Sequence, residues 1–481
     1  MNYRMIGYLL GLILLVESAL MAFPALVAMI YDESPMPFFI TMALLIVISM
    51  PLVMFKPQNK RIFAKDGFIV VAAAWILMSL FGALPFTISG AIPSFVNAFF
   101  ETVSGFTTTG ATILLDIESL PKGILFWRSF THWVGGMGVL VFMLAILPTA
   151  GGGQNVHLMR AEVPGPTKGK LVPKMRQTAL ILYGIYFLLT FAEFIALLLC
   201  KMPVYDSIVN SLATAGTGGF SVLNNSIGGY NNPAAEWVVA AFMFIFGVNF
   251  NLYYFIIIGR AREIFKNEEF KTYVILCLTS CAVIVANTIK TVEGIGDCIR
   301  NAFFHVASIV STTGFATLDY DAMWPELSKT VIIVLTLVGA CAGSTAGGLK
   351  LSRVIILMKG MLAQIRKVIR PHSVNVVKLD GEAVPDETVR SAMGYISIYL
   401  LIIVITTLCI SVDGFGLETN LTAAVTCINN VGPGLAEVGP AGNFSGFSVF
   451  SKLLLSFNML LGRLEIMPML IFLSPVAWRK R

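Results

Sequence analysis

The chain of 481 residues is 57% hydrophobic and only 12% charged, with a formal net charge of +6. A typical soluble domain is about 45–50% apolar and about 25% charged, so a set of soluble domains is excluded. Apolar runs of roughly 20 residues, the length that crosses a bilayer, recur along nearly the whole sequence. The seven cysteines include no C-x-x-C pair, which argues against a disulfide framework or a zinc site. The sequence therefore predicts an integral membrane protein.

Taken in chain order, the apolar runs predict a series of transmembrane helices. We expect them at residues 5–30, 38–55, 67–88, 123–147, 177–200, 235–258, 270–289, 328–358 with an interruption, 389–412 and 447–476. The first run follows Arg4 and resembles a signal peptide, but its apolar core is far longer than an h-region and contains Pro24. We therefore expect this run to be retained as a helix.

The distribution of Lys and Arg predicts the orientation of these helices. Basic residues concentrate in the alternate segments 56–66, 148–176, 259–271, 359–388 and 478–481, whereas the opposite segments hold only Lys122, Lys201, Lys290 and Arg300. The positive-inside rule then places both termini in the cytoplasm, and it accounts for the net charge without a nucleic-acid partner. The outer segments are acidic and would concentrate cations, although any single carboxylate there is better explained as a solvated loop residue.

One short motif occurs four times, each time in a predicted outer segment. Residues 98–110 read AFFETVSGFTTTG and residues 302–314 read AFFHVASIVSTTG. Weaker relatives are SIVNSLATAGTGGFS at 207–221 and LTAAVTCINNVGPG at 421–434. Aligned on one glycine, the copies end in four triplets that we number as segments 1 to 4: Thr108-Thr109-Gly110, Thr217-Gly218-Gly219, Thr312-Thr313-Gly314 and Asn430-Val431-Gly432.

The spacing of these segments predicts the architecture. Between successive glycines there is room for a span, a short helix, a loop and a returning span. A helix too short to cross the bilayer must dip in and return, and irregular backbone at that depth has to be buried by protein or reached by water. We predict an all-α integral membrane fold in which four tandem helix–pore-helix–filter-loop–helix repeats surround a pseudo-fourfold pore. Two extra transmembrane helices at 1–65 precede the repeats at 66–176, 177–268, 269–388 and 389–481.

The residue types in the segments predict a cation-selective filter. Backbone carbonyls can replace the water shell of a cation, and glycine allows the unusual φ values that aim them inward. The short helices end at the segments, so the negative ends of their dipoles also favour a cation. A single Thr-Thr-Gly is better explained as a helix with a glycine C-cap. Four occurrences in corresponding loops favour the filter, with segment 4 as the weakest member because Asn430 and Val431 replace threonines.

Residues 339–350, within the eighth predicted span, read GACAGSTAGGLK. One interpretation is a helix that packs closely through Gly339, Gly343 and Gly347 in a G-x-x-x-G pattern. The other is a broken helix that forms a gate loop in the middle of the membrane. Its candidate residues are Gly343, Ser344, Thr345, Ala346, Gly347, Gly348 and Lys350.

Arg463 lies in the last predicted span beside Glu465, and ionisable residues in membrane spans are functional candidates. We expect Arg463 to contact the small-residue loop and help set a closed state. The alternative is a structural pair with Glu465 or with lipid. Glu17 and Arg128 are either functional or locally paired, and we expect His305 to make a polar contact behind the filter.

These motifs resemble the membrane subunits of the Trk/Ktr/HKT potassium-transport superfamily, in particular the bacterial Trk type, over the whole chain. The matching motifs are TTTGAT at 107–112, GGFS at 218–221, STTGF at 311–315, CAGSTAGGLK at 341–350 and NNVGPGLAEVG at 429–439. The resemblance implies that Gly110, Gly219, Gly314 and Gly432 are the filter glycines for K⁺. It also implies that 339–350 is the gate and Arg463 its contact. Ala346 interrupts the all-glycine run that is usual in the family.

The resemblance further implies a homodimer in the lipid of a bacterial inner membrane. Its expected partners are cytoplasmic nucleotide-binding regulatory subunits of the TrkA type, which sense NAD or ATP. Within this chain no Gly-rich nucleotide fingerprint follows a strand, so K⁺ as transported ion is the only small partner expected.

Other functional classes fit less well. An enzyme is disfavoured, because the histidines at 132, 157, 305 and 372 are scattered and no G-x-S-x-G motif occurs. A symporter that couples K⁺ to H⁺ or Na⁺ through the same filter remains the alternative. Coupled carriers tend to contain inverted repeats, whereas these four share one orientation. This favours channel-like conduction without excluding coupling.

Overall fold

The computed structural model describes residues 1–59, 63–138, 175–289, 294–372 and 375–478. Most of the predicted inner segment 148–176, the basic tail 479–481, and Lys290 lie outside the described residues. The fold is helical, as predicted, apart from one small ribbon in which β1 (Lys378–Leu379) pairs antiparallel with β2 (Glu382–Ala383). Among the described residues, the predicted all-α fold class is therefore wrong only at this ribbon.

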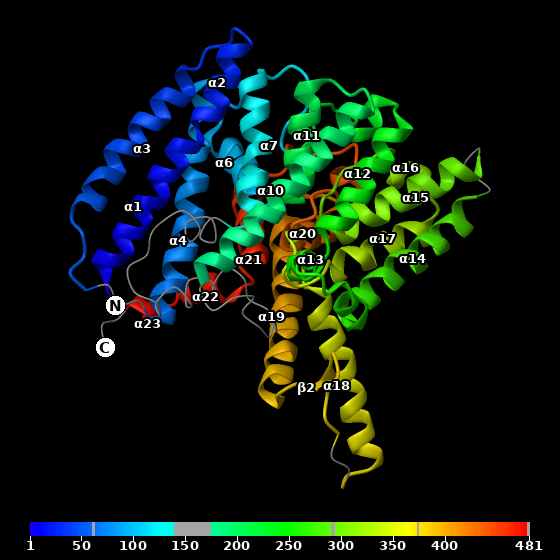
Figure 1. The fold of residues 1–481 in the computed structure, drawn as a ribbon. Coiled ribbons are helices and arrows are strands. Elements are labelled where there is room, and N and C mark those ends of the chain that lie inside the picture. The colour runs from blue at the N-terminus through cyan, green and yellow to red at the C-terminus, as the bar shows by residue number, and fades with distance from the viewer. Residues whose placement is uncertain (60–62, 139–174, 290–293, 373–374, 479–481) are drawn as a thin grey trace.

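The chain begins with a helical hairpin. Helices α1 (Tyr3–Leu20) and α2 (Ala22–Ile30) together form the first predicted span, and α3 (Met36–Met54) returns beside them, at the left in Figure 1. Gly11 allows the close approach, because a Cβ there would lie 2.8 Å from Leu52 Cβ. Large apolar side chains on α3 remain exposed, as expected for a surface that faces lipid.

Four long helices each lead into a shorter one. The long helices are α4 (Ala64–Gly82, extended by α5, Leu84–Ile88), α10 (Met175–Leu199), α14 (Glu268–Thr288) and α19 (Asp386–Ile410). The shorter helices are α6 (Phe95–Phe106), α11 (Val204–Gly216), α15 (Ile295–Val310) and α20 (Leu417–Asn429). The shorter helices are mostly buried and bring polar residues such as Ser104 and Ser308 into the interior. Polar groups therefore lie inside while apolar ones face outward, which is the arrangement a bilayer selects.

The returning helices differ from one another. They are α7 (Lys122–Gly136); α12 (Pro233–Phe246) with α13 (Phe250–Ile257); α17 (Glu326–Val338) with α18 (Leu351–Ile369); and α21 (Val449–Arg463) with α22 (Met467–Leu473) and α23 (Pro475–Trp478). Short connecting helices are η1 (Ser226–Tyr230), η2 (Ala261–Lys266), α16 (Tyr320–Met323), η3 (Ser411–Asp413) and η4 (Ala436–Val438). Helix α7 ends at Gly136, and residues 139–147 of its predicted span lie outside the described residues.

Two spans predicted as continuous are broken. At 235–258 the axes of α12 and α13 differ by 93°. The Asn249 side chain accepts a hydrogen bond from Asn251 N and so caps a new helix. At 447–476 the helix stops after Arg463, because Glu465 and Ile466 adopt positive φ, and α22 starts at Met467 with Pro468 in its first turn. Among the described residues six helices are long and apolar enough to cross a membrane, or up to seven with the bent pair.

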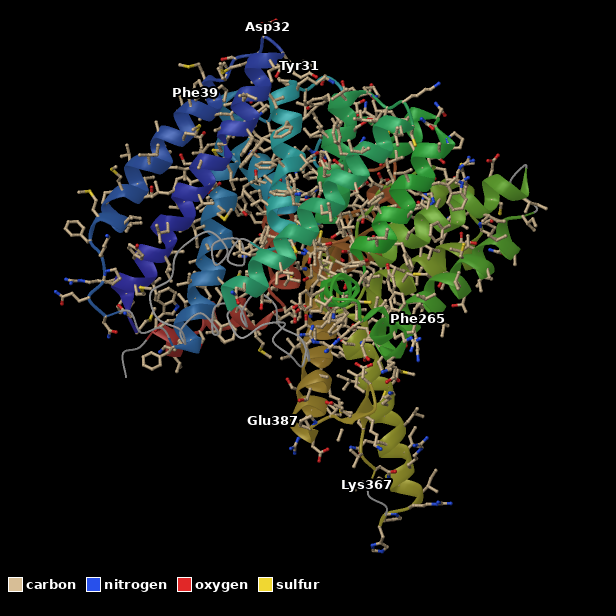
Figure 2. All side chains as sticks on the ribbon, in the orientation of Figure 1. Tyr31, Asp32, Phe39, Phe265, Lys367 and Glu387 are labelled. Carbon is tan, nitrogen blue, oxygen red and sulfur yellow. The ribbon has the colours of Figure 1, made fainter. Side chains whose placement is uncertain are left out.

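The two ends of the molecule have different surfaces. Figure 2 shows Tyr31 and Asp32 at one end, Lys367 and Glu387 at the other, and Phe39 on the outer face of α3. Helices α18 and α19 project beyond the rest of the fold at the Lys367 end (Figure 1). The chain ends lie together, since the Tyr3 hydroxyl donates to the Trp478 carbonyl at 2.7 Å.

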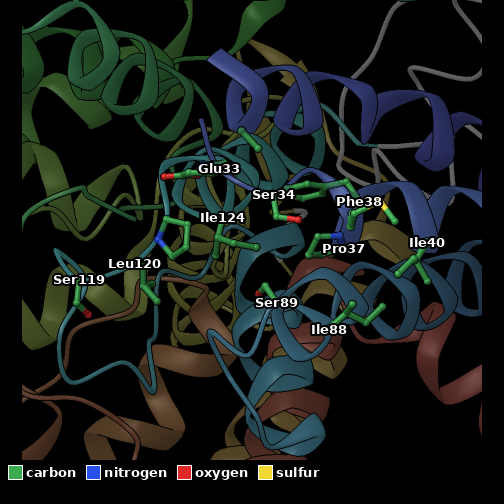
Figure 3. A pocket seen from close by; sticks show the side chains of 14 residues that line it. Glu33, Ser34, Pro37, Phe38, Ile40, Ile88, Ser89, Ser119, Leu120 and Ile124 are labelled. Atoms are coloured by element: carbon green, nitrogen blue, oxygen red, sulfur yellow. Dashed lines mark hydrogen bonds between the residues drawn. The ribbon is translucent and has the colours of Figure 1, made fainter. Parts of the chain in front are cut away.

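A cavity of about 620 Å³ lies between the N-terminal hairpin and the start of α7 (Figure 3). Its Glu33 carboxylate accepts hydrogen bonds from the backbone nitrogens of Lys122 and Gly123, at 2.6 and 2.9 Å. This carboxylate satisfies the first free N–H groups of α7 and complements the helix dipole. No residue of segments 1 to 4 lines the cavity. The Glu33 carboxylate in its wall holds the start of α7 in place.

Candidate functional site

Segments 1 to 4 share one backbone conformation. Each begins with a non-glycine residue at positive φ and ends with a glycine at positive φ. The first residues are Thr108 (55°), Thr217 (55°), Thr312 (58°) and Asn430 (54°), and the glycines are Gly110 (81°), Gly219 (79°), Gly314 (84°) and Gly432 (94°). The left-handed conformation costs a non-glycine residue about 1–2 kcal/mol, with asparagine among the residues that tolerate it best. Asn430 is therefore a conformational match for the threonines that it replaces.

The end of each short helix stabilises this conformation. The middle residue of each segment donates its N–H to the carbonyl five residues earlier, the long bond of a Schellman closure. The pairs are Thr109 to Ser104 (2.9 Å), Gly218 to Ala213 (3.0 Å), Thr313 to Ser308 (2.8 Å) and Val431 to Thr426 (3.0 Å). The left-handed cap is thus the threonine or asparagine, and the aligned glycine comes two residues later. The C-cap interpretation of that glycine is therefore wrong.

The four glycines place the segments in a closed ring. A Cβ on Gly110 would lie 2.1 Å from the Gly218 carbonyl oxygen, and one on Gly219 would lie 2.0 Å from the Thr313 oxygen. The same contacts run from Gly314 to the Val431 oxygen (2.1 Å) and from Gly432 to the Thr109 oxygen (2.7 Å). Each segment thus abuts the next, and segment 4 returns to segment 1. No side chain fits at these four positions.

Side-chain hydroxyls brace two of the segments. Thr109 Oγ1 lies 2.8 Å from Thr107 Oγ1, and Thr313 Oγ1 lies 2.7 Å from Ser311 Oγ. Asn430 Nδ2 donates to Thr109 Oγ1 at 3.0 Å and so joins segment 4 to segment 1. These polar groups are wholly buried, and hydrogen bonding removes most of the cost of burying them.

Arg128 pairs locally, one of the two outcomes that the sequence allowed. Its Nε lies 2.7 Å from Glu101 Oε1, and both side chains are buried. The Glu101 carboxylate also accepts hydrogen bonds from Thr112 Oγ1 and Ile113 N, directly beyond segment 1. Arg128 Nη1 donates to the Ser221 carbonyl at 3.2 Å, directly beyond segment 2. The pair therefore contacts the residues that follow two neighbouring segments.

Residues 339–350 are not helical, so the helix-packing interpretation of Gly339, Gly343 and Gly347 is wrong. Positive φ values at Gly339, Gly343 and Gly348 turn the chain into a loop between α17 and α18. Phe250 N donates to the Gly343 carbonyl at 2.9 Å, so the break between α12 and α13 provides part of the loop's seat.

Glu269 fixes the loop where it meets α18. One oxygen of its carboxylate accepts from the backbone nitrogens of Ala342 and Ser352, at 2.8 and 2.9 Å. Lys350 is compensated within the loop, since its Nζ donates to the Ala346 carbonyl. Sequence reasoning missed Glu269, although a carboxylate in the first turn of an apolar span was an available signal.

The loop contacts both the ring and Arg463. Gly347 N donates to Thr312 Oγ1 at 2.7 Å, and a Cβ on Gly347 would lie 2.7 Å from the Asn429 carbonyl. Arg463 Nη1 donates to the Thr345 carbonyl at 2.8 Å, the contact that the sequence predicted. Its Nη2 donates to the carbonyls of Gly135 and Gly136, at 2.6 and 2.7 Å. Glu465 forms its ion pair with Arg353.

An exposed acidic side chain follows segment 1. Asp116 follows segment 1, and its Oδ1 accepts from Asn224 Nδ2 at 3.0 Å. This hydrogen bond lowers the pKa of Asp116, so the exposed carboxylate stays ionised and attracts cations. His305 makes the expected polar contact within its own helix α15, where its Nδ1 lies 2.9 Å from the Asn301 carbonyl.

Comparison with known proteins gives a consistent result. Residues 35–479 match the family model described as TrkH, cation transport protein. The chain is 35% identical to the Trk system potassium uptake protein TrkH of Salmonella typhimurium and to that of Escherichia coli K12, over the full length of each. It is 32% identical to the TrkG protein of Escherichia coli K12, over 99% of both chains. The crystal structure of the potassium transporter TrkH from Vibrio parahaemolyticus superposes with a TM-score of 0.89, 32% identity and full coverage of both chains.

The buried ion pair generates a stability prediction. Arg128→Met should lower the free energy of unfolding by about 3–5 kcal/mol, because it leaves the Glu101 carboxylate buried without its counter-ion. The double variant Arg128→Met/Glu101→Leu should recover part of that loss. Thermal unfolding of detergent-solubilised protein measures both. Equal destabilisation in the single and double variants would contradict the account.

Proposed function

The chain belongs to the TrkH family of cation transport proteins, and from this premise we propose that it is the K⁺-selective, ion-translocating subunit of a bacterial potassium uptake system. The proteins of this family are transporters and not enzymes. Potassium is the ion named for the relatives, and the ring of segments 1 to 4 supplies the chemistry that K⁺ requires.

The closed ring of carbonyl groups is the observation that carries this proposal. Each of the glycines 110, 219, 314 and 432 abuts the carbonyl of the next segment, so the segments surround a common axis. Carbonyl oxygens on that axis can replace the hydration shell of a K⁺ ion. Four short helices also end at the ring, and each contributes roughly half a negative charge from its dipole. A cation is stabilised there and an anion is repelled.

The same arrangement supports four tandem repeats around a pseudo-fourfold pore. Each of the proposed repeats 66–176, 177–268, 269–388 and 389–481 contributes one long helix, one short helix, one segment of the ring and one returning helix. The returning helices differ among the repeats. In the third repeat the loop 339–350 separates α17 from α18, and in the second repeat the break between α12 and α13 contacts that loop. The N-terminal hairpin, 1–65, belongs to none of the four proposed repeats.

We further propose that the loop 339–350 is the gate. It lies against the ring through Thr312, and Arg463 holds it through the Thr345 carbonyl. A fixed positive charge near the ion path opposes a cation, so Arg463 favours the closed state by contact and by charge. Opening requires these hydrogen bonds to break.

We also propose partners for this chain, from its exposed surfaces and its distribution of basic residues. The projecting α18 and α19 offer a surface for cytoplasmic nucleotide-binding subunits of the TrkA type, and the exposed apolar helices fit membrane lipid (Figure 1). We propose a homodimer in the bacterial inner membrane with both termini cytoplasmic. The bias of basic residues toward the predicted inner segments supports this orientation.

A K⁺/H⁺ symporter with the same filter is the second candidate, and Glu17 is the observation that favours it. This side chain is 1% exposed, and its carboxylate oxygens have no hydrogen-bond partner among the described residues. A buried carboxyl group of this kind is a place for a transported proton. Coupling to Na⁺ has no comparable support.

Ion flux into proteoliposomes tests the proposed function directly. The purified wild-type protein should take up K⁺ and Rb⁺ in strong preference to Na⁺, and the flux should follow the K⁺ gradient without an imposed proton gradient. Uptake that requires the proton gradient and is lost in Glu17→Gln would support the symporter. Equal uptake of K⁺ and Na⁺ would refute the filter.

Gly110→Ala should weaken the preference for K⁺ over Na⁺ by at least about tenfold, the equivalent of about 1.4 kcal/mol. The new Cβ would meet the Gly218 carbonyl oxygen at 2.1 Å and displace it. Gly90→Ala is the matched control, because Gly90 has a similar φ of 77° and nothing within 4 Å of its Cβ position. Competition of Na⁺ with Rb⁺ uptake measures both. Similar selectivity in the two variants would argue against the ring.

Arg463→Gln should raise basal K⁺ flux, measured without regulatory subunits, by at least about tenfold. Hydrogen bonds from a charged donor contribute about 1.5–3 kcal/mol each, and this variant removes the charged donor of three. Arg300→Gln, which removes ion pairs with Glu236 and Asp297, neither of them in the loop, should leave basal flux unchanged. A well-inserted Arg463→Gln protein without increased flux would indicate a structural role.

A further inference from the structure

On the premise of the proposed function, we propose that His132 is a positioning residue that holds segment 2 and thereby sets ion selectivity. His132 lies on α7, is wholly buried and belongs to none of the four segments. The sequence alone predicted no role for His132.

Segment 2 differs from the others in side-chain content. Its middle residue is Gly218, where the other segments have Thr109, Thr313 and Val431. The threonines are braced by neighbouring hydroxyl groups, and Gly218 has no side chain with which to form such a contact. Two adjacent glycines also make this the segment with the greatest backbone freedom. Another group must hold it if the ring is to keep its dimensions.

The imidazole of His132 occupies the space that a side chain on residue 218 would need. A Cβ on Gly218 would lie 2.2 Å from His132 Cγ, and one on Gly216 would lie 2.3 Å from the His132 carbonyl oxygen. The ring also packs on Phe220, with centroids 4.1 Å apart. The missing side chain of segment 2 and the histidine behind it are therefore complementary in shape.

Two hydrogen bonds fix the orientation of the imidazole. Nδ1 lies 2.7 Å from the Gly105 carbonyl, and Nε2 lies 3.3 Å from the Phe220 backbone nitrogen. A carbonyl only accepts and an amide only donates, so Nδ1 carries the proton and Nε2 accepts. The neutral side chain thus joins the end of α6 to the residue that follows segment 2. It therefore links segment 1 to segment 2, its neighbour in the ring.

Arg128, one turn earlier on α7, holds the same stretch of backbone at a second point. Its guanidinium carbon lies 3.5 Å from the Phe220 ring centroid, and Nη1 donates to the Ser221 carbonyl. Residues four apart on a helix lie on one face, so α7 presents both side chains to segment 2 together. Loss of His132 leaves Arg128 holding only the outer end, while Gly218 becomes free to shift.

His305 provides a matched control. It is also wholly buried, and its Nδ1 lies 2.9 Å from the Asn301 carbonyl of its own helix. Its ring packs against Tyr320 and Trp324, both outside the ring-forming segments. A substitution there removes a buried imidazole of similar environment without removing a link between segments.

The test compares Na⁺ competition with Rb⁺ uptake in proteoliposomes for the full-length wild type, His132→Leu, His132→Gln and His305→Leu. Leucine removes both hydrogen bonds, and we expect the preference for K⁺-like ions to fall by about tenfold, or about 1.4 kcal/mol. Glutamine can donate to Gly105 and accept from Phe220, so His132→Gln should stay close to wild type, as should His305→Leu. Retained selectivity in His132→Leu would overturn the proposal. An equal loss in His132→Gln and His132→Leu, or in both leucine variants, would also overturn it.

If His132→Leu does not assemble, a second pair of variants tests whether His132 and residue 218 share one space. Gly218→Ala alone should impair selectivity, because its Cβ meets the imidazole, and the added change His132→Ala should restore part of the loss. No restoration would refute the shared-space argument. A wild-type protein without K⁺ preference would refute the proposed function itself, whereas an unaffected His132→Leu beside a selective wild type would refute only this inference.

Discussion

The contact between a glycine and a neighbouring carbonyl oxygen, made once by each segment, is the constraint on which the rest of the structure depends. With about 2.0–2.7 Å between each Cβ position and the next oxygen, none of the glycines 110, 219, 314 and 432 can carry a side chain. The positive φ at each glycine adds a conformational reason for the same residue. The surrounding fold delivers four helix ends to one place and excludes lipid from the polar backbone exposed there.

The ring and the loop beneath it form one hydrogen-bonded unit. Gly347 N donates to Thr312 Oγ1, so a residue of segment 3 also seats the loop. Arg463 joins the loop to the end of α7 through Thr345 and the carbonyls of Gly135 and Gly136. Helix α7 in turn holds segment 2 through His132 and segment 1 through Glu101 and Arg128. Displacement of the loop therefore changes contacts that reach two sides of the ring.

Local sequence could predict the parts that depend on local rules. The recurring Thr-Gly pattern located segments 1 to 4, and even the weakest, with Asn430, has the common backbone conformation. The small-residue run gave the break before Lys350 as one of two interpretations, and a close-packed helix was the other. The breaks at Asn249 and Ile466 were missed, because apolar content alone does not reveal a cap formed by one asparagine or a helix restarted at Pro468. His132 and Glu269 were missed because their partners are backbone groups distant in sequence.

The position of a bound ion tests the central claim most directly. Anomalous diffraction from crystals grown in Rb⁺ or Tl⁺ would locate the ion independently of transport activity. Peaks are expected on the axis of the ring, between the carbonyl oxygens of residues 109, 218, 313 and 431. Well-occupied ion peaks elsewhere in the molecule, with none inside the ring, would contradict it.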